Sequence, residues 1–374
     1  MSQKKFCYFS VFQRTDQKIA FRQARSIKDA GHDVTLLFCD GLPEEEIDGM
    51  KVKTIPLKAN IGQYFKRLFL FPFYFAKELK AIDADIYECC DIDSLLLCLI
   101  LKRRGKRVIF NLLEEHPYTL KDKIRGPKWL KNAIIIIMAQ WMRFTLRRVD
   151  MVFTVAPSIV DYLHKWGLKN VQILGNYPNI NKDYCLTYED YGQRQNRILY
   201  FGAIYSISRQ EVFFDALSSL NNVTYLLAGD FGIGYYKDIL RMHPYWNKVE
   251  FINRFPPSDL PKLMAKSTIS NVLRDFGVTG YKTGSYGVIK VFESMEAGLP
   301  IICSDVQVYR DIMREYPCGI LVNPNDSLEI RNAIQYLVNN KKEAYEMGQN
   351  GRRAIIEKYN WETESKKLLA LFND

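Results

Sequence analysis

The feature that most constrains the fold is a pattern of short apolar segments that alternate with helical segments, and this pattern occurs twice. In the first half, six segments are apolar at nearly every position, at residues 6–12, 33–39, 85–90, 107–113, 150–156 and 170–176. The pattern restarts at residues 198–202, 223–229, 249–253, 268–274, 300–305 and 319–322. Strands that are apolar on both faces and separated by helices, such as 16–30 and 158–166, indicate a parallel sheet covered on both sides. The sequence therefore predicts an α/β protein with two doubly wound domains.

The chain length agrees with two domains, because 374 residues exceed what one hydrophobic core usually supports. Between the two patterns, residues 177–197 contain four tyrosines and many polar residues with little periodicity, which is typical of a linker. We expect a first domain at 1–178, a linker at 179–196 and a second domain at 197–359. Two such domains should face each other across a cleft, and ligands of such sheets bind at the carboxyl ends of the strands.

The charge is distributed unequally. Residues 1–185 hold 30 Lys and Arg against 20 Asp and Glu, whereas residues 186–374 hold 22 of each. The whole net charge of +10 therefore lies in the first half. This asymmetry predicts an anionic partner for that half: a membrane, an acidic substrate or nucleic acid.

The eight cysteines are scattered and the four histidines lie far apart, so no zinc-binding spacing is present and we expect reduced thiols in a cytosolic protein. The first sixteen residues lack the long apolar core of a signal peptide. No apolar run reaches the roughly 18 residues that a membrane-spanning helix needs.

A loop and helix at 275–296 carry the clearest chemistry. Four glycines between 275 and 287 allow the backbone to approach a ligand closely. A helix is predicted to begin near Val288, so its free N–H groups and positive dipole end form a phosphate site. Lys290 adds a positive charge, and Glu293 can accept two hydrogen bonds from a ribose diol. The pattern predicts a nucleotide diphosphate site, although the spacing alone equally fits a surface helix with a Lys–Glu pair.

The stretch 290–305, KVFESMEAGLPIICSD, closely resembles a characteristic stretch of glycosyltransferase family 4. Further similar stretches follow the family's order, at 86–117, 147–178, 200–211, 318–326 and 359–372. The resemblance implies a GT-B fold, with two Rossmann-like domains and a last helix, 360–374, that crosses back onto the first domain. It implies a retaining transfer from a UDP-, GDP- or dTDP-linked sugar to a glycan or lipid-linked acceptor. No metal or other cofactor is expected.

The family's site residues can be carried over to matching positions. The resemblance implies that Glu293 binds the donor ribose, that Lys290 and Arg209 lie near its diphosphate, and that Gly202 passes close to the donor. The remaining donor-side positions are Gly229, Arg254, Ser285, Tyr286, Gly287, Val288 and Ile289. In the first domain, Asp16, within the loop 13–18, and Asp91 face the acceptor, and the further catalytic candidates are Glu114 and His116.

The sequence departs from the family at several of these positions. Ser285 replaces the first of two glutamates that are usually eight positions apart, and Ala203 stands where an arginine often follows the strand-end glycine. Leu113 stands where a histidine often precedes the glutamate, so that His116 is the nearest substitute. No glycine precedes Gly31, although the family's first loop is often glycine-rich. These differences concern the catalytic detail, and an inactive relative is one alternative.

Two other motifs admit two interpretations each. Asp91 and Asp93 are spaced like a metal-binding pair, but Asp91 directly precedes a predicted helix, and we expect it to be an N-cap. Residues 229–234, GDFGIG, resemble a dinucleotide fingerprint. A single glycine-rich turn is weak support for that function, and here it follows a strand of the second domain. The turn then borders the donor's base instead.

Three classes of function are consistent with these sequence features. The first is a retaining glycosyltransferase acting in surface polysaccharide or glycoconjugate assembly. The second is a nucleotide-sugar 2-epimerase of the same fold, and the third is a non-catalytic binding module. Nucleic acid is not the expected partner, because no basic and aromatic motif of an RNA or DNA module is present. An oxidoreductase is disfavoured, because the first strand lacks the glycines of a dinucleotide turn.

Residues 121–148 hold eight Lys and Arg and one Asp, and their centre, 133–142, is apolar except for Gln140. Trp129 and Trp141 lie near the ends of this centre, and residues 58–80 repeat the mixture of basic and aromatic residues. One interpretation is that both segments are helices that cover the sheet with apolar faces in the core. The other is an interfacial helix that rests on the cytoplasmic membrane and receives a polyprenyl-diphosphate-linked acceptor.

Overall fold

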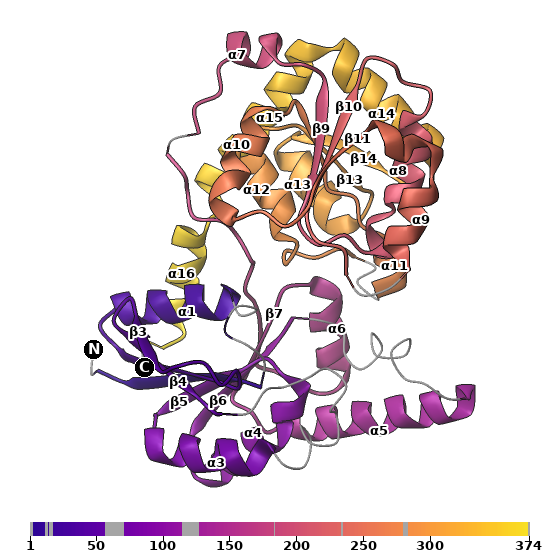
Figure 1. The fold of residues 1–374 in the computed structure, drawn as a ribbon. Coiled ribbons are helices and arrows are strands. Elements are labelled where there is room, and N and C mark those ends of the chain that lie inside the picture. The colour runs from indigo at the N-terminus through magenta and orange to yellow at the C-terminus, as the bar shows by residue number, and fades with distance from the viewer. Residues whose placement is uncertain are drawn as a thin grey trace. The chain divides into compact units, whose positions relative to one another are not determined.

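The computed structural model describes residues 3–11, 14, 18–56, 71–113, 127–182, 184–232, 235–279 and 283–372. The chain forms two compact units, residues 1–175 together with 364–374, and residues 176–363. Each unit contains a mainly parallel sheet covered by helices, as Figure 1 shows. The α/β fold class with two Rossmann-like sheets is thereby confirmed. In the described ranges, no helix is both long and apolar enough to cross a membrane.

The first sheet has eight strands within the described residues, in the order β3-β4-β2-β1-β5-β6-β7-β8. Their bounds are β1 Lys5–Ser10, β2 Asp33–Phe38, β3 Glu45–Ile47, β4 Met50–Thr54, β5 Ile86–Cys89, β6 Arg107–Leu112, β7 Met151–Thr154 and β8 Val171–Ile173. All six strands predicted for this half are present. The hairpin β3–β4, whose pairing is antiparallel, was not predicted, because its acidic and basic residues have no continuous apolar pattern.

The helices of the first unit lie on both faces of its sheet. They are α1 Lys18–Asp29, α3 Phe71–Ile82, the short helix η2 Ile92–Ser94, α4 Leu95–Arg103, α5 Lys128–Leu146 and α6 Pro157–Lys165. Figure 1 shows α1 on one face and α3 and α4 on the other. The end of the last helix, α16 Trp361–Ala370, also belongs to this unit, and Phe372 packs edge-on against Phe6 with 5.0 Å between ring centroids.

The second sheet has six parallel strands in the described part of the chain, in the order β11-β10-β9-β12-β13-β14. Their bounds are β9 Arg197–Phe201, β10 Thr224–Ala228, β11 Val249–Ile252, β12 Ile269–Asn271, β13 Ile301–Ser304 and β14 Gly319–Val322. Each of these strands was predicted. The helices are α7 Tyr188–Gln193, η4 Ser206–Ser208, α8 Gln210–Leu217, α9 Tyr236–Met242, η5 Pro244–Lys248, η6 Pro257–Asp259, α10 Leu260–Ala265, α11 Phe276–Thr279, α12 Ile289–Glu296, α13 Gln307–Glu315, α14 Ser327–Asn339 and α15 Lys341–Glu357.

Part of the segment interpreted as a linker is structured on the second unit. It contains α7, and the buried Tyr191 donates a hydrogen bond of 2.8 Å to the carbonyl of Thr268. The backbone N–H of Asn181 donates to the Glu296 carboxylate at 2.5 Å. The buried Tyr191 and the hydrogen bond from Asn181 therefore attach a segment that has little helical or strand periodicity.

Each sheet contains a switch point, where the order of the strands reverses direction. In the second sheet the chain runs outward from β9 through β10 to β11 and then returns to β12 on the other side of β9. In the first sheet the switch lies between β1 and β5. The carboxyl ends of the two strands at a switch point are where such sheets bind ligands.

Candidate functional site

Two glycines end β9 and β10 at the carboxyl edge of the second sheet. Gly202 has φ of +95° and Gly229 has φ of +151°, values that side chains disfavour. A Cβ on Gly229 would lie 1.9 Å from the carbonyl oxygen of Gly202, so the two backbones meet directly. The structure thus gives a physical reason for glycine at both predicted donor-side positions.

Lys290 lies beside Gly202. Its ammonium nitrogen is 3.9 Å from the centroid of the buried Tyr200 ring and 3.8 Å from where a Cβ on Gly202 would stand. The aromatic face stabilises the ammonium. No carboxylate forms an ion pair with Lys290 in the described part of the chain. The structure therefore brings two predicted site residues together at the end of β9, with a positive charge that a ligand can use.

Helix α12 holds Lys290 in place. Val291, Phe292 and Met295 are buried, as the predicted apolar arc requires, whereas Ile289 is only half-buried. The hydroxyl groups of Ser294 and Ser270 lie 2.7 Å apart, which ties α12 to β12. Helix α12 begins at Ile289, and Val288 stands at its N-cap. The Val288 side chain accepts no hydrogen bond, so it does not cap the first N–H groups of the helix.

The turn before α12 is held by the second unit itself. The buried Ser285 hydroxyl accepts a hydrogen bond of 2.9 Å from the N–H of Gly287, and the carbonyl of Tyr286 accepts one of 3.0 Å from Asn176. The Tyr286 ring packs near Tyr359, at 6.5 Å between centroids. Ser285 thus stabilises the turn that precedes α12.

The resemblance places Arg209 near the donor diphosphate, and in the structure its side chain binds Asp275. It adopts a left-handed backbone conformation, φ 49° and ψ 41°, and its guanidinium donates to one oxygen of Asp275 at 3.0 Å and 2.6 Å. Asp275 follows β12, so this pair joins the two strands of the switch point. Burial opposes ionisation of Asp275, but hydrogen bonds from Arg209 and Asn325 outweigh it and keep the pKa of Asp275 below its usual range. Arg209 therefore shares its charge with Asp275 in the structure, and the Glu211 carboxylate lies 3.5 Å from the guanidinium.

A buried hydrogen-bond network holds the start of α8, which directly follows Arg209. The Tyr225 hydroxyl donates to the Gln210 side chain at 2.5 Å and accepts from Asn271 at 2.9 Å. The backbone N–H of Gln210 donates to the hydroxyl of Tyr236 at 2.8 Å. These residues fix the start of α8 next to Arg209. Sequence reasoning missed them and missed Asp275, although an acid directly after the strand at the switch point was a usable signal.

Glu293 lies half-buried on α12, close to the buried Glu296. Burial raises the pKa of Glu296 to about 7, the hydrogen bond from Asn181 and the charge of Arg352 oppose that rise, and the charge of Glu293 adds to it. Arg254 is exposed and lies 3.6 Å from Asp230, at the ends of β11 and β10. It therefore stands at the far side of the predicted site, because β10 and β9 lie between β11 and β12 in the sheet.

The candidates of the first unit are described in part. Asp16, Glu114 and His116 lie outside the described residues. Asp91 precedes η2 as predicted, but the N-cap prediction is wrong for its side chain, which makes no cap hydrogen bond. Its buried carboxylate instead accepts a hydrogen bond of 2.7 Å from Val11, because the switch point brings the end of β5 beside the end of β1.

Burial raises the pKa of Asp91 to about 6, although hydrogen bonds from Ser10 and Val11 oppose the rise. The neighbouring Glu88 is also buried, and its pKa is raised to about 7 by that burial in spite of a hydrogen bond from Asn111. No group of three His, Cys, Asp or Glu in the described residues is placed to hold a metal ion.

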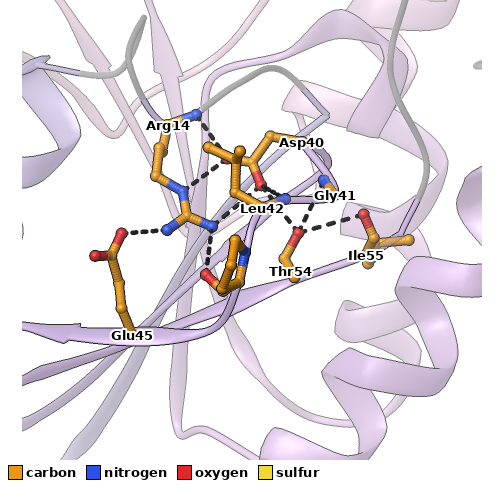
Figure 2. Close-up of polar contacts among 8 residues, drawn as sticks. Arg14, Asp40, Gly41, Leu42, Glu45, Thr54 and Ile55 are labelled. Carbon is orange, nitrogen blue, oxygen red and sulfur yellow. Dashed lines mark hydrogen bonds and ion pairs between the residues drawn. The ribbon is translucent and has the colours of Figure 1, made fainter.

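A buried ion pair that the sequence analysis did not identify lies at the same edge (Figure 2). Arg14, after β1, donates to both oxygens of Asp40, after β2, at 2.7 Å and 3.1 Å. It also contacts Glu45 and the carbonyl of Pro43. Burial opposes ionisation of Asp40, but the hydrogen bonds from Arg14, Leu42 and Thr54 lower its pKa to about 2. The pair anchors the segment after β1 to the end of β2.

Each of the two units matches the model of a known protein family. Residues 17–176 match the model of the glycosyl transferase 4-like domain, and residues 190–354 match that of the glycosyl transferases group 1. A protein of Methanocaldococcus jannaschii, described as an uncharacterized glycosyltransferase, is 24% identical over 245 residues. That match spans 65% of this chain and 61% of the relative's length.

Solved structures share the fold over nearly the whole chain. Sucrose-phosphate synthase from Thermosynechococcus elongatus has a TM-score of 0.79 at 14% identity, with 99% of this chain and 98% of that chain covered. Anabaena HepE, solved with UDP and glucose, has a TM-score of 0.72 at 14% identity, with 100% of both chains covered. The two family matches in succession, on two Rossmann-like sheets with this shared fold, indicate a glycosyltransferase of the GT-B type that is similar to family 4.

Proposed function

We propose that the protein transfers a sugar from a nucleotide-diphosphate sugar, with retention at the anomeric carbon, to a glycan or lipid-linked acceptor. The observation that carries the proposal is the position of Lys290. It combines a positive charge without a carboxylate partner in the described residues, a glycine backbone at the end of β9 and the N-terminus of α12. These are the groups that a diphosphate needs.

In this proposal the donor diphosphate lies against Lys290 and the first turn of α12, and Glu293 accepts hydrogen bonds from the ribose. HepE, which shares the fold, was solved with UDP, and this supports a nucleotide donor here. Arg209 holds the loop after β9 through Asp275 and shares its charge with the phosphates. The nucleobase lies toward Gly229 and Arg254, at the ends of β10 and β11.

The chemical task is to stabilise the leaving group. As the nucleoside diphosphate departs, negative charge gathers on its β-phosphate while the sugar becomes cation-like. Preorganised cations and helix N–H groups lower that barrier, and loss of one such donor typically costs about 3–4 kcal/mol. We propose that the acceptor attacks from the same face and that the departing phosphate helps to remove its proton.

We propose that Lys290, Arg209 and the dipole of α12 do the neutralising that a divalent metal does elsewhere, so that neither metal nor other cofactor takes part. Turnover should then be unchanged in EDTA. Complete loss of turnover in EDTA, restored by Mn²⁺ or Mg²⁺, would refute this part of the proposal and return attention to Asp91 and Asp93.

On the acceptor side, we propose a polyprenyl-diphosphate-linked or other glycan acceptor, used in surface polysaccharide or glycoconjugate assembly at the inner face of the plasma membrane. The excess of positive charge in residues 1–185 supports an anionic acceptor. Asp16 and Asp91 stay predictions for the residues that face it, and Glu114 and His116 stay predictions for catalytic residues of the first unit.

The experiment is a thermal-shift screen against UDP-, GDP- and dTDP-sugars, because a ligand that binds only the folded state raises the melting temperature. We expect one nucleotide family to stabilise the wild type and to lose its effect in Lys290→Ala. No shift with any nucleotide sugar would contradict the proposal. Isomerised sugar formed without any acceptor would instead identify a 2-epimerase.

A further inference from the structure

Helix α5 exposes large apolar side chains along one face. Trp129 is 71% exposed, Ile137 67% and Ile136 60%, and Trp141 and Phe144 are exposed as well. At about 100° per residue, these five positions fall within one arc of the helix, which we call the α5 apolar face. Figure 1 shows α5 as a long helix that extends beyond the neighbouring α3 and α4.

The opposite side of α5 already supplies the packing that the unit needs. Ile135, Met142, Thr145 and Leu146 are buried there, and the helix contacts α4. No residue from Lys128 to Ile134 is buried. A covering role in the core therefore explains one side of α5 and leaves the α5 apolar face unexplained. Apolar surface that gathers in this way marks an interaction site.

The charges around this face have one sign. Between residues 128 and 149 there is no Asp or Glu, and the basic residues are Lys128, Lys131, Arg143, Arg147 and Arg148. None of the five forms an ion pair with a carboxylate in the ranges that the structure describes. The guanidinium of Arg148 lies 3.5 Å from the centroid of the Phe144 ring, so basic and aromatic groups are interleaved.

The neighbouring helices α3 and α4 also expose large apolar side chains. Helix α4 contacts both α3 and α5, so the three helices form one layer. Phe73 and Tyr74 on α3 and Leu96 on α4 are exposed. Exposed aromatic residues with basic residues beside them are the composition of a helix that lies in the plane of a membrane interface.

We propose that the α5 apolar face, with its flanking lysines and arginines, docks the first unit on an anionic lipid bilayer. Trp129, Ile136, Ile137, Trp141 and Phe144 enter the boundary between headgroups and acyl chains, and the basic residues bind the lipid phosphates. A lipid surface fits better than an acidic protein partner because the residues of the face are bulky and apolar, whereas the charges lie toward the two ends of the helix. Delivery of a lipid-linked acceptor rests on the proposed function, but the docking does not.

The experiment is flotation of the full chain with vesicles of phosphatidylcholine, with and without phosphatidylglycerol, at low and high salt. We expect binding to anionic vesicles that weakens as salt rises. Ile136→Glu with Ile137→Glu should lower the affinity at least about tenfold, because two apolar side chains are lost from the interface. The matched control is Met242→Glu on α9 of the second unit, where Met242 is 77% exposed, and this variant should bind like the wild type.

A second pair of variants tests the charges. Arg147→Glu with Arg148→Glu should weaken binding by about fivefold or more for each charge, since each basic residue near an anionic leaflet contributes on that scale. Arg314→Glu, an exposed position of the second unit, is the control. Thermal melting and nucleotide affinity, measured on every variant, separate loss of docking from loss of folding or of donor binding.

The proposal is overturned if the wild type does not float with anionic vesicles at low salt, or if both double variants float as well as the wild type. It is also overturned if the Ile136→Glu, Ile137→Glu variant changes only a concentration-dependent self-association, because the α5 apolar face would then bind a second copy of the chain.

Discussion

The carboxyl edges of the two sheets both contain a switch point, but each edge holds a cation with a different kind of partner. In the second sheet, Lys290 presents a positive charge beside the backbone of Gly202. In the first sheet, the buried Arg14 gives its hydrogen bonds to Asp40, Glu45 and Pro43. One edge keeps a cation for a ligand, whereas the other uses its cation to hold the protein together. Both switch points are places where a ligand could bind. A cation there is available to a ligand only where, like Lys290 in the described residues, it has no carboxylate partner.

The largest effect on stability should come from Arg14→Ala. The change leaves the Asp40 carboxylate buried without its main partner, and breaking a buried pair in this way costs about 3–5 kcal/mol. Urea unfolding would measure the free energy of unfolding, with Lys262→Ala, an exposed lysine, as the control. The affinity for nucleotide sugar should stay unchanged in whatever folded protein remains. A loss of donor affinity without a loss of stability would contradict this prediction, because Arg14 would then bind the donor and would not stabilise the first unit.

The next largest effect should come from Lys290→Ala and Glu293→Ala, and it should be on binding. Hydrogen bonds to charged groups are worth about 1.5–3 kcal/mol, so donor affinity should fall about tenfold to a hundredfold. Isothermal titration calorimetry would measure the affinity, and melting curves should show that both variants fold. Unchanged nucleotide affinity in both would remove the assignment of the donor site to α12.

A smaller effect is expected from Tyr225→Phe, which tests whether the buried network positions Arg209. The change leaves the Gln210 and Asn271 side chains without their shared partner, and an unsatisfied buried polar group costs about 1–3 kcal/mol. We expect this loss in urea unfolding together with a fall in kcat that exceeds any rise in KM for the donor. A loss of stability with unchanged kcat would limit the network to folding.

The smallest effect concerns pH. The pKa of Glu88 is raised to about 7 in the folded protein, so the folded state holds a proton that the unfolded chain releases near pH 4. Its stabilising contribution is therefore present below about pH 4 and is lost as pH rises through 7. Glu88→Gln, which keeps the acceptor for Asn111, should raise the free energy of unfolding at pH 8 relative to pH 5 by about 1–2 kcal/mol.

Asp40 gives the opposite sign. Because its pKa is lowered to about 2, its contribution is present above about pH 4 and is lost as pH falls through 2. Asp40→Asn should therefore reduce the loss of stability on acidification. Urea unfolding at pH 3, 5 and 8 distinguishes the two carboxylates, and the same pH dependence in both variants would contradict the burial of Glu88 or the pairing of Asp40.

The sequence by itself determined the strands and the helix that carries Lys290. Residues on both faces of a central strand are buried, so a parallel strand appears as a continuous apolar run wherever it lies in the chain. The loop before α12 was recognised from its glycines, and α12 from the spacing of Val291, Phe292 and Met295. These signals are local, and they need no knowledge of which strands are neighbours.

Only the tertiary structure decided which charges are paired. Arg14 meets Asp40 because β1 and β2 are adjacent, and Arg209 meets Asp275 because β12 returns to the side of β9. These partners lie 26 and 66 residues apart, and no local periodicity relates them. For α5 the sequence left two interpretations open, a covering helix and an interfacial helix, and only the tertiary structure shows that the helix packs against α4 while Ile136 and Ile137 stay exposed. Local patterns fix what each segment can bury, and the order of the strands fixes what each side chain meets.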